Sequence, residues 1–412
     1  MIRNQLTKSR VSTTLLAFIA VCLTISMVFF PEDAFAAAVK GLDVWWNIVF
    51  PALLPFFIGS ELLMGLGVVH FMGVLLQPLM RPVFNVPGVG SFVMAMGLAS
   101  GFPIGSILTT RLRREELCSK VEGERLMSFT NTADPLFMFG AVAVGMFGYP
   151  QIGVTIAIAH YLSSIFTGIL LRFYGSGQAN SPDEVTSGSI LWRGFSAMFE
   201  ARKKDGRPMG QLMGDAVRTS VNTLLLIGGF IILFAVIIRI LTVVGIVGVF
   251  AAMIIRVLAP LGLDPALTPA IISGFFEVTL GSQLAGQAAE SIPMIQKVMV
   301  VSAVIAWSGL SVHAQVASII SETDMKIAPF VVARFVHAVL AAFFSWLLMG
   351  PLAPAVATSV PVFAYLQPEG GMSFLQRTFH MSWLFAALSI SILVIGIILG
   401  AMKSVTVVIF RR

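Results

Sequence analysis

Apolar stretches long enough to cross a bilayer follow one another along most of this chain, and they constrain its fold more than any other feature. Of 412 residues, 57% are hydrophobic and 11% are charged, whereas a soluble domain carries roughly a quarter charged residues. Every backbone polar group in lipid must be paired within the chain, so apolar runs of about twenty residues form helices. The short alternating segments of an outer-membrane barrel are not found. The sequence therefore predicts an all-α polytopic membrane protein.

The basic residues give the chain a net charge of +6, and they gather at the ends of the apolar runs. That placement favours orientation in the lipid bilayer by the positive-inside rule over a nucleic-acid partner. Two cysteines, Cys22 and Cys118, form neither a disulfide framework nor a metal pattern. We expect no metal and no cofactor.

The N-terminal segment, 1–43, is predicted to be a transmembrane helix followed by an outside loop. Basic residues precede an apolar run at 11–30, and Ala34-Phe35-Ala36 follows it. This pattern is also typical of a cleaved secretory signal, but a run of about twenty residues favours an uncleaved helix.

Four further segments follow from the composition of the rest of the chain. A first repeat is expected at 44–174, a polar cytoplasmic linker at 175–215, and a second repeat at 216–350. An outside loop and a C-terminal transmembrane helix are expected at 351–412.

The tripeptide Ser-Gly-Phe occurs at 100–102 and again at 273–275, each time inside an apolar stretch. Pro103 follows the first copy, and proline and glycine together stop a helix. We therefore predict a re-entrant hairpin at 88–110, and a second at 265–290 with its tripeptide near the middle. Each is followed by an apolar stretch with a polar centre, which predicts broken spans at 126–149 and 293–320.

The order of spans predicts an inversion between the two repeats. Starting from a cytoplasmic N-terminus, the first hairpin opens inward and the second outward, with about eight full spans in all. Both termini and the linker then lie in the cytoplasm.

Polar, interrupted membrane segments at matching places in two halves indicate a transporter binding site. Glu277 is an intramembrane carboxylate, so we take it as the ion-coupling candidate, with a structural acid as the alternative. The substrate-binding candidates lie on the tripeptides, the hairpins and the broken spans: Ser100, Gly101, Phe102, Ser106, Asn131, Thr132, Asp134, Ser273, Gly274, Thr279, Ser308 and Gln315.

Structural alternatives exist for several of these residues. Asn131 and Asp134 are also typical helix caps before Pro135, and Ser106 and Thr279 can bond back to their own helix. His313 is a weaker candidate, since membrane histidines often bond to a neighbouring helix. His160 and His337 are interpreted as structural.

Enzymatic patterns are missing from the sequence. No nucleophile elbow, zinc-protease motif or phosphate-binding loop occurs, so we do not expect an enzyme, although a membrane hydrolase built from Ser and His is an open alternative.

Three runs carry a family resemblance: Ser100-Gly-Phe-Pro-Ile-Gly-Ser106, Asn131-Thr-Ala-Asp-Pro-Leu-Phe137 and Ser273-Gly-Phe-Phe-Glu277. Over nearly its whole length the chain resembles the sporulation integral membrane proteins of the YlbJ type (SpoVV-like). That family belongs to a larger group sharing the gate region of concentrative nucleoside transporters. The resemblance implies an elevator-like fold with two re-entrant hairpins.

The resemblance also implies a role in endospore and cortex formation. It suggests carriage of dipicolinic acid, a small aromatic dianion, from mother cell toward forespore, in the mother-cell-derived outer forespore membrane. Phe102-Pro103 replaces the polar hairpin pattern expected at a nucleoside site, which argues against nucleosides. The dianion suits helix N-termini, whereas Glu277 repels it unless protonated or paired with a cation.

The sequence and the resemblance together predict a secondary transporter of a small organic anion; Na⁺ and H⁺ are both candidates for a coupling ion, and the sequence does not choose between them. A passive gate or channel and a structural protein of spore-envelope assembly are the alternatives. Carriers with inverted repeats often form homo-oligomers, which no residue here specifies.

Overall fold

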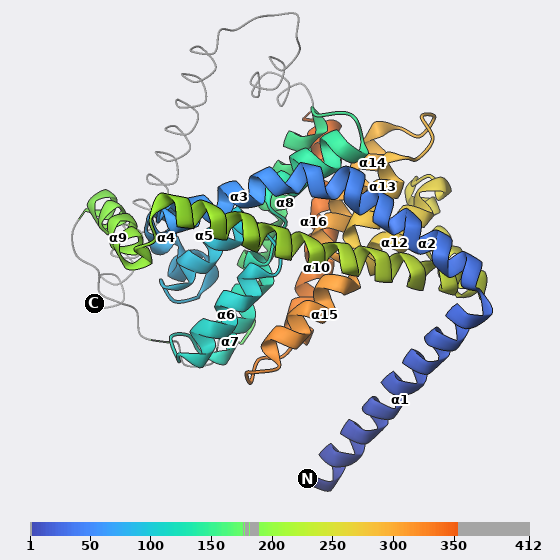
Figure 1. Ribbon diagram of the computed structural model, residues 1–412, viewed down its shortest axis with the longest axis horizontal. Helices are drawn as coiled ribbons and strands as arrows, with labels where there is room; N and C mark the ends of the chain where they lie inside the picture. The colour runs from blue at the N-terminus through green and yellow to red at the C-terminus, as the bar shows by residue number, and fades with distance from the viewer. Residues whose placement is uncertain (1, 176, 178–180, 182–188, 353–412) are drawn as a thin grey trace, which may run out of the picture.

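The computed structural model describes residues 2–175, 177, 181 and 189–352, and every regular element within them is a helix (Figure 1). Five helices of the described part are long and apolar enough to cross a membrane: Pro31–Gly65, Ile152–Leu171, Met209–Val243, Met294–Ile320 and Ala328–Met349. Shorter apolar helices lie between them. The prediction of an all-helical chain with several membrane-length apolar segments is confirmed. The predicted loop and final span at 351–412 fall almost wholly outside the described residues.

The N-terminal part departs from the sequence prediction. After α1 (Ile2–Phe29), the helix α2 (Pro31–Val44) runs into the π-helix η1 (Trp45–Val49) and on into α3 (Phe50–Gly65). The outside loop predicted before residue 44 is therefore wrong. Pro31 occupies the first turn of α2 together with Glu32 and Asp33, and these are favoured helix-start residues. Ala-rich sequence then continues the helix.

The described chain contains two series of helices in the same order. The first is α3, α4 (Val68–Leu79), η2 (Met80–Phe84), α5 (Gly90–Ser100), α6 (Ile104–Arg114), α7 (Lys120–Thr130), η3 (Phe137–Met146) and α8 (Ile152–Leu171). The second is α10 (Met209–Val243), α11 (Ile246–Leu258), η4 (Ala259–Leu261), η5 (Pro265–Leu267), α12 (Thr268–Phe276), α13 (Val278–Gly286), α14 (Met294–Trp307), α15 (Gly309–Ile320) and α16 (Ala328–Met349). Gly67 and Gly245 begin the second helix of each series with φ of 80° and 85°.

Each series therefore consists of a long helix, a short helix, a tightly turned helix pair, a broken helix and a closing helix. The long helices α3 and α10 run side by side (Figure 1). The broken helices lie against the closing ones, with α14 packed on α16 and α8, and α16 packed on α7. This packing puts both helix breaks in the interior.

The predicted linker at 175–215 contains the helix α9 (Ile190–Asp205), and α10 already begins at Met209. Gly194 allows α9 to approach Phe71 of α4, because a Cβ there would lie 2.8 Å from the Phe71 ring. Arg193 of α9 donates a hydrogen bond to the side-chain oxygen of Gln77, which also lies in α4. Part of the linker is thus a helix bound to the first series.

Candidate functional site

The first helix pair turns where the sequence predicts. The helix α5 ends at Ser100, Gly101 has a φ of +70°, and α6 begins at Ile104 after Pro103. The positive φ is a conformation that glycine adopts without steric cost.

The second pair turns elsewhere than expected. Ser273 and Gly274 lie inside α12, and the turn comes at Glu277, between α12 and α13. No proline follows this copy of the tripeptide, so α12 continues through it to Phe276. The second tripeptide lies near the middle of its helix pair, as predicted, but only the first copy forms the turn itself.

Both broken helices are interrupted at the predicted polar segments. The helix α7 ends at Thr130, and the chain is non-helical from Asn131 to Asp134. The helix α14 ends at Trp307, and Ser308 and Gly309 both have positive φ, of 68° and 74°. Each break leaves backbone groups without helical partners, which are then available to side chains or ligands.

Each turn packs directly against the break of its own series. A Cβ on Gly101 would lie 2.7 Å from Oδ2 of Asp134, and a Cβ on Gly309 would lie 3.0 Å from the Cα of Glu277. The first series thus has glycine at the turn and an acid at the break. The second has the acid at the turn and glycine at the break.

The two buried carboxylates cap the helices that follow them. Oδ1 of Asp134 accepts hydrogen bonds from the amides of Leu136 (2.9 Å) and Phe137 (2.8 Å). Oε2 of Glu277 accepts one from the amide of Leu280 at 2.8 Å. Neither acid makes a salt bridge within the described residues. Asp134 therefore caps the following helix, as the sequence predicts.

A cavity of about 80 Å³ lies where the turns, the breaks and the long helices meet, and we name it the central cavity. Its polar wall consists of Asp134, Glu277, Thr279, Ser311 and Gln315. The opposite wall is apolar and comes from η1 and α3 (Val49, Leu53, Phe57) and from α10 (Ile227, Phe230). Phe102, Phe137, Val278 and Val312 complete the lining. Four predicted binding residues and the predicted coupling residue therefore share one cavity.

The other candidates of the first series support the turn and the break without lining the cavity. Ser100 and Ser60 share a hydroxyl hydrogen bond of 3.0 Å, and Thr132 donates to the carbonyl of Gly97 at 3.4 Å. Ser106 and Asn131 are fully buried, and their side chains have no hydrogen-bond partner in the described part of the chain.

The remaining candidates of the second series also lie outside the central cavity. Ser273 lines a different cavity, described below, and Gly274 packs against Val304. The hydroxyl of Ser308 donates to the carbonyl of Trp307 at 2.6 Å. The structure thus does not bring these three residues to the predicted site.

The histidines hold the backbone around the breaks. Nε2 of His160 accepts from the amide of Ala133 at 3.1 Å, and Nε2 of His337 lies 2.9 Å from the carbonyl of His160. Nδ1 of His313 lies 2.7 Å from the carbonyl of Gly309. The contacts of His160 and His313 are made at the breaks, His337 contacts α8 behind the first break, and none of the three histidines lines the central cavity.

Arg334 of α16 is a buried cation that the sequence interpretation missed. Its side chain is fully buried and donates to the carbonyls of Asn131 (2.9 Å), Ala306 (3.5 Å) and Ser128. These carbonyls lie at the ends of both α7 and α14. Arg334 is the one charged residue between Ala328 and Met349, and an isolated membrane arginine is the signal that could have identified it.

Replacing Gly101 with alanine should destabilise the site. The new Cβ meets Asp134, and a residue with a side chain is forced into a backbone conformation that is nearly restricted to glycine, which costs about 1–3 kcal/mol before the clash is counted. Gly229, in the interior of α10 with open space around it, provides the control. Gly229→Ala should leave the melting temperature unchanged or raise it. Equal melting temperatures for the two variants in detergent would contradict this account.

Comparison with known proteins identifies the family. Residues 47–178, from η1 past the end of α8, match the Gate family model, described as nucleoside recognition. The sporulation integral membrane protein YlbJ of Bacillus subtilis (strain 168) is 46% identical over 346 residues, which is 84% of this chain and 84% of the relative. No solved structure matches the chain. The chain therefore belongs to the family of the sporulation integral membrane protein YlbJ.

Proposed function

We propose that this protein is a secondary transporter of a small organic anion in the sporulating cell, with dipicolinic acid as the substrate to test first. The observation that carries the proposal is the central cavity, where polar groups from both series converge among apolar helices. Family membership supports the setting, because the relative is a sporulation integral membrane protein. The outer forespore membrane, with both termini in the cytoplasm, is the proposed location.

The shared order of elements supports a transport fold of two inverted repeats, each with a re-entrant hairpin. In such folds the substrate binds at the interface of the repeats, near discontinuous helices. The apolar wall from α3 and α10 faces the polar wall from the turns and breaks. Movement of one wall against the other opens the cavity to each side of the membrane in turn.

The anion is assigned to the N-terminus of α15. The N-termini of η3 and α13 are already occupied by Asp134 and Glu277, so they are not free to bind an anion. The N-terminus of α15 has no side-chain cap, and Ser311 and Gln315 of the same helix line the cavity. A helix N-terminus attracts a carboxylate. This assignment moves the expected anion site from the hairpin tips to the second break.

Coupling to a cation follows from the charges in the cavity. Two carboxylates of the protein and one or two of the substrate would repel each other strongly in a site of low dielectric. A proton or a sodium ion at Glu277 removes part of that repulsion, so cation and anion bind together. The phenyl rings of Phe57, Phe102, Phe137 and Phe230 offer offset or edge contacts to an aromatic substrate.

Transport of labelled dipicolinate into proteoliposomes tests the proposal. With the purified protein and an imposed proton or sodium gradient, we expect accumulation above the external concentration. Equilibration without accumulation would indicate a passive gate or channel. No flux in either direction would contradict transport of dipicolinate and favour a structural role in spore-envelope assembly.

A substitution at Gln315 tests where the anion binds. Gln315→Leu keeps the volume and removes the amide donor, so the apparent affinity for dipicolinate should fall about tenfold, the effect of one lost hydrogen bond to a charged group. Gln287 is exposed at the end of α13, and Gln287→Leu should leave the affinity unchanged. The measurement is the half-saturating concentration of dipicolinate. Equal values for both variants would place the anion elsewhere.

A further inference from the structure

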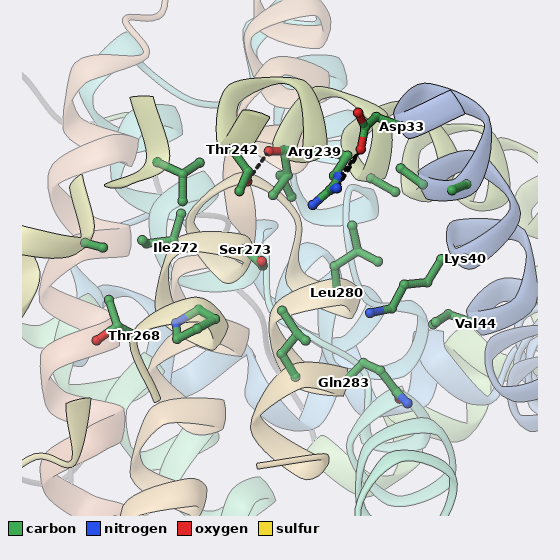
Figure 2. Close-up of a pocket in the computed structure, with 18 of the residues that line it drawn as sticks. Asp33, Lys40, Val44, Arg239, Thr242, Thr268, Ile272, Ser273, Leu280 and Gln283 are labelled. Carbon is green, nitrogen blue, oxygen red and sulfur yellow. Dashed lines mark hydrogen bonds and ion pairs between the residues drawn. The ribbon is translucent and has the colours of Figure 1, made fainter. Parts of the chain in front are cut away.

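A second and larger cavity of about 650 Å³ lies behind the second hairpin, and we name it the lateral cavity (Figure 2). One wall comes from α2, α10 and α11, and the other from the pair α12–α13. Its lining is mainly aliphatic, with residues such as Ala36, Val44, Ala251, Ile272 and Leu280. Its size lies within the range of about 300–1,000 Å³ that is typical of ligand-binding pockets.

In the first series, the helix at the corresponding position, α4, packs tightly on its neighbour α5. Val69, Gly73 and Leu76 of α4 are buried, and a Cβ on Gly73 would lie 3.2 Å from the Cα of Phe92 in α5. Direct contact between α4 and α5 fills the corresponding position.

The corresponding helix of the second series, α11, contacts α12 but packs on it less closely than α4 packs on α5. No residue of α11 is buried. Val247, Ala251 and Ile255, which share one helix face, line the lateral cavity. Val249 and Met253 on the opposite face are exposed. The helix α11 is thus apolar on both faces, and the face that points toward α12 borders a cavity. An apolar ligand has room between α11 and the α12–α13 pair.

Lys40 gives the lateral cavity an unneutralised positive charge. Its side chain extends from α2 toward Leu280 (Figure 2), and it has no hydrogen bond or ion pair with any described residue. The other basic lining residue, Arg239, is neutralised by Asp33, whose Oδ1 accepts from its Nε at 2.9 Å.

The floor of the same cavity also holds a polar group without a partner. Gln283 of α13 is only 7% exposed, and its amide oxygen accepts no hydrogen bond from the described part of the chain. Such groups are costly to bury unless a partner is supplied. The cavity thus combines a long aliphatic lining with one cation and one unpartnered polar side chain.

We propose that the lateral cavity binds one anionic phospholipid, with an acyl chain under α11 and the phosphate at Lys40. Basic pockets between membrane helices bind anionic lipid head groups, and an aliphatic lining suits a hydrocarbon chain better than a small polar anion. The bound lipid contacts both α2 and the α12–α13 pair, so it holds the second hairpin, with Glu277 at its turn, against the long helices. This site is separate from the central cavity and does not depend on what the protein transports.

Native mass spectrometry of the full chain, extracted in mild detergent, tests the proposal. The purified protein is exposed to equal amounts of phosphatidylglycerol and phosphatidylcholine. We expect one tightly retained phosphatidylglycerol. Lys40→Gln should weaken its retention about fivefold, the contribution of one lysine to binding an anionic lipid surface, and Lys40→Arg should restore it. Ala251→Trp, which fills the space under α11, should abolish retention, and Ile255→Trp provides a second filling variant should the first not fold.

Arg256 is the matched control, because it is an exposed basic residue of α11 outside the cavity lining. Arg256→Gln should retain phosphatidylglycerol as the unaltered protein does. Equal retention of both lipids, equal losses in Lys40→Gln and Arg256→Gln, or an unchanged lipid count in folded filling variants would each overturn the proposal. An unchanged lipid count in the filling variants is also the result expected if residues 380–402 of the chain, and not a lipid, occupied the cavity.

Discussion

With dipicolinate as the proposed substrate, replacing Glu277 with glutamine should abolish its uphill accumulation while leaving the protein folded. The amide oxygen of glutamine still accepts the hydrogen bond that the Leu280 amide donates to Glu277, so the cap of α13 survives. The variant carries no negative charge, and thus it neither binds a proton nor attracts sodium. We expect the accumulation ratio in proteoliposomes to fall at least tenfold, about 1.4 kcal/mol of lost coupling. Downhill exchange of labelled for unlabelled substrate should persist.

Two further variants separate coupling from capping. Glu277→Ala removes the cap as well as the charge and should lower stability by about 1 kcal/mol more than Glu277→Gln. Glu290 is exposed, and Glu290→Gln should transport as the unaltered protein does. If Glu277→Gln accumulates dipicolinate with unchanged dependence on pH and sodium, Glu277 is a structural cap and coupling resides elsewhere.

The breaks in the helices could be predicted because local chemistry determines them. Pro103 removes an amide donor and Gly101 adopts a positive φ, so the end of α5 follows from two residues. Asp134 lies directly before a proline and caps the next helix. In the same way Glu277 was identifiable, since a lone carboxylate in an apolar stretch is rare enough to indicate function.

The rest of the site depends on contacts between segments distant in the sequence. Ser273 and Gly274 repeat the local sequence of the first turn, yet they lie within α12 because the second turn is formed at Glu277. The apolar wall of the central cavity comes from Leu53 and Phe230, whose ordinary apolar surroundings give no signal of function. The helix α2 lies where the sequence predicts an outside loop, although Pro31 and Glu32 in its first turn are favoured helix-start residues.

The exchange of acid and glycine between the two series bears on mechanism. Asp134 belongs to a break and Glu277 to a turn, so the two carboxylates are not equivalent even if the repeats are. Glu277 is part of the turn between α12 and α13, whereas Asp134 is part of the break after α7, so the two carboxylates are attached to different elements of the polar wall. The proposed cation at Glu277 would therefore bind to the α12–α13 pair, which is also the element that the proposed lipid contacts.

Arg334→Met should lower the stability of the protein more than any surface substitution. The variant leaves the carbonyls of Ser128, Asn131 and Ala306 without their donor. Each buried carbonyl that loses its partner costs about 1–3 kcal/mol, so a total of roughly 3–5 kcal/mol is expected if the site relaxes partly.

Thermal unfolding in detergent measures the effect of Arg334→Met, and Arg114 supplies the control. Arg114 pairs with Glu322 at 2.8 Å, and both side chains are 62% exposed, so Arg114→Met should cost at most about 1 kcal/mol. Because Arg334 bonds to the ends of both α7 and α14, its loss should also reduce dipicolinate binding, whereas Arg114→Met should not. A melting temperature for Arg334→Met equal to that of Arg114→Met would show that the breaks are held by other contacts, with the histidines His160 and His337 the first to examine.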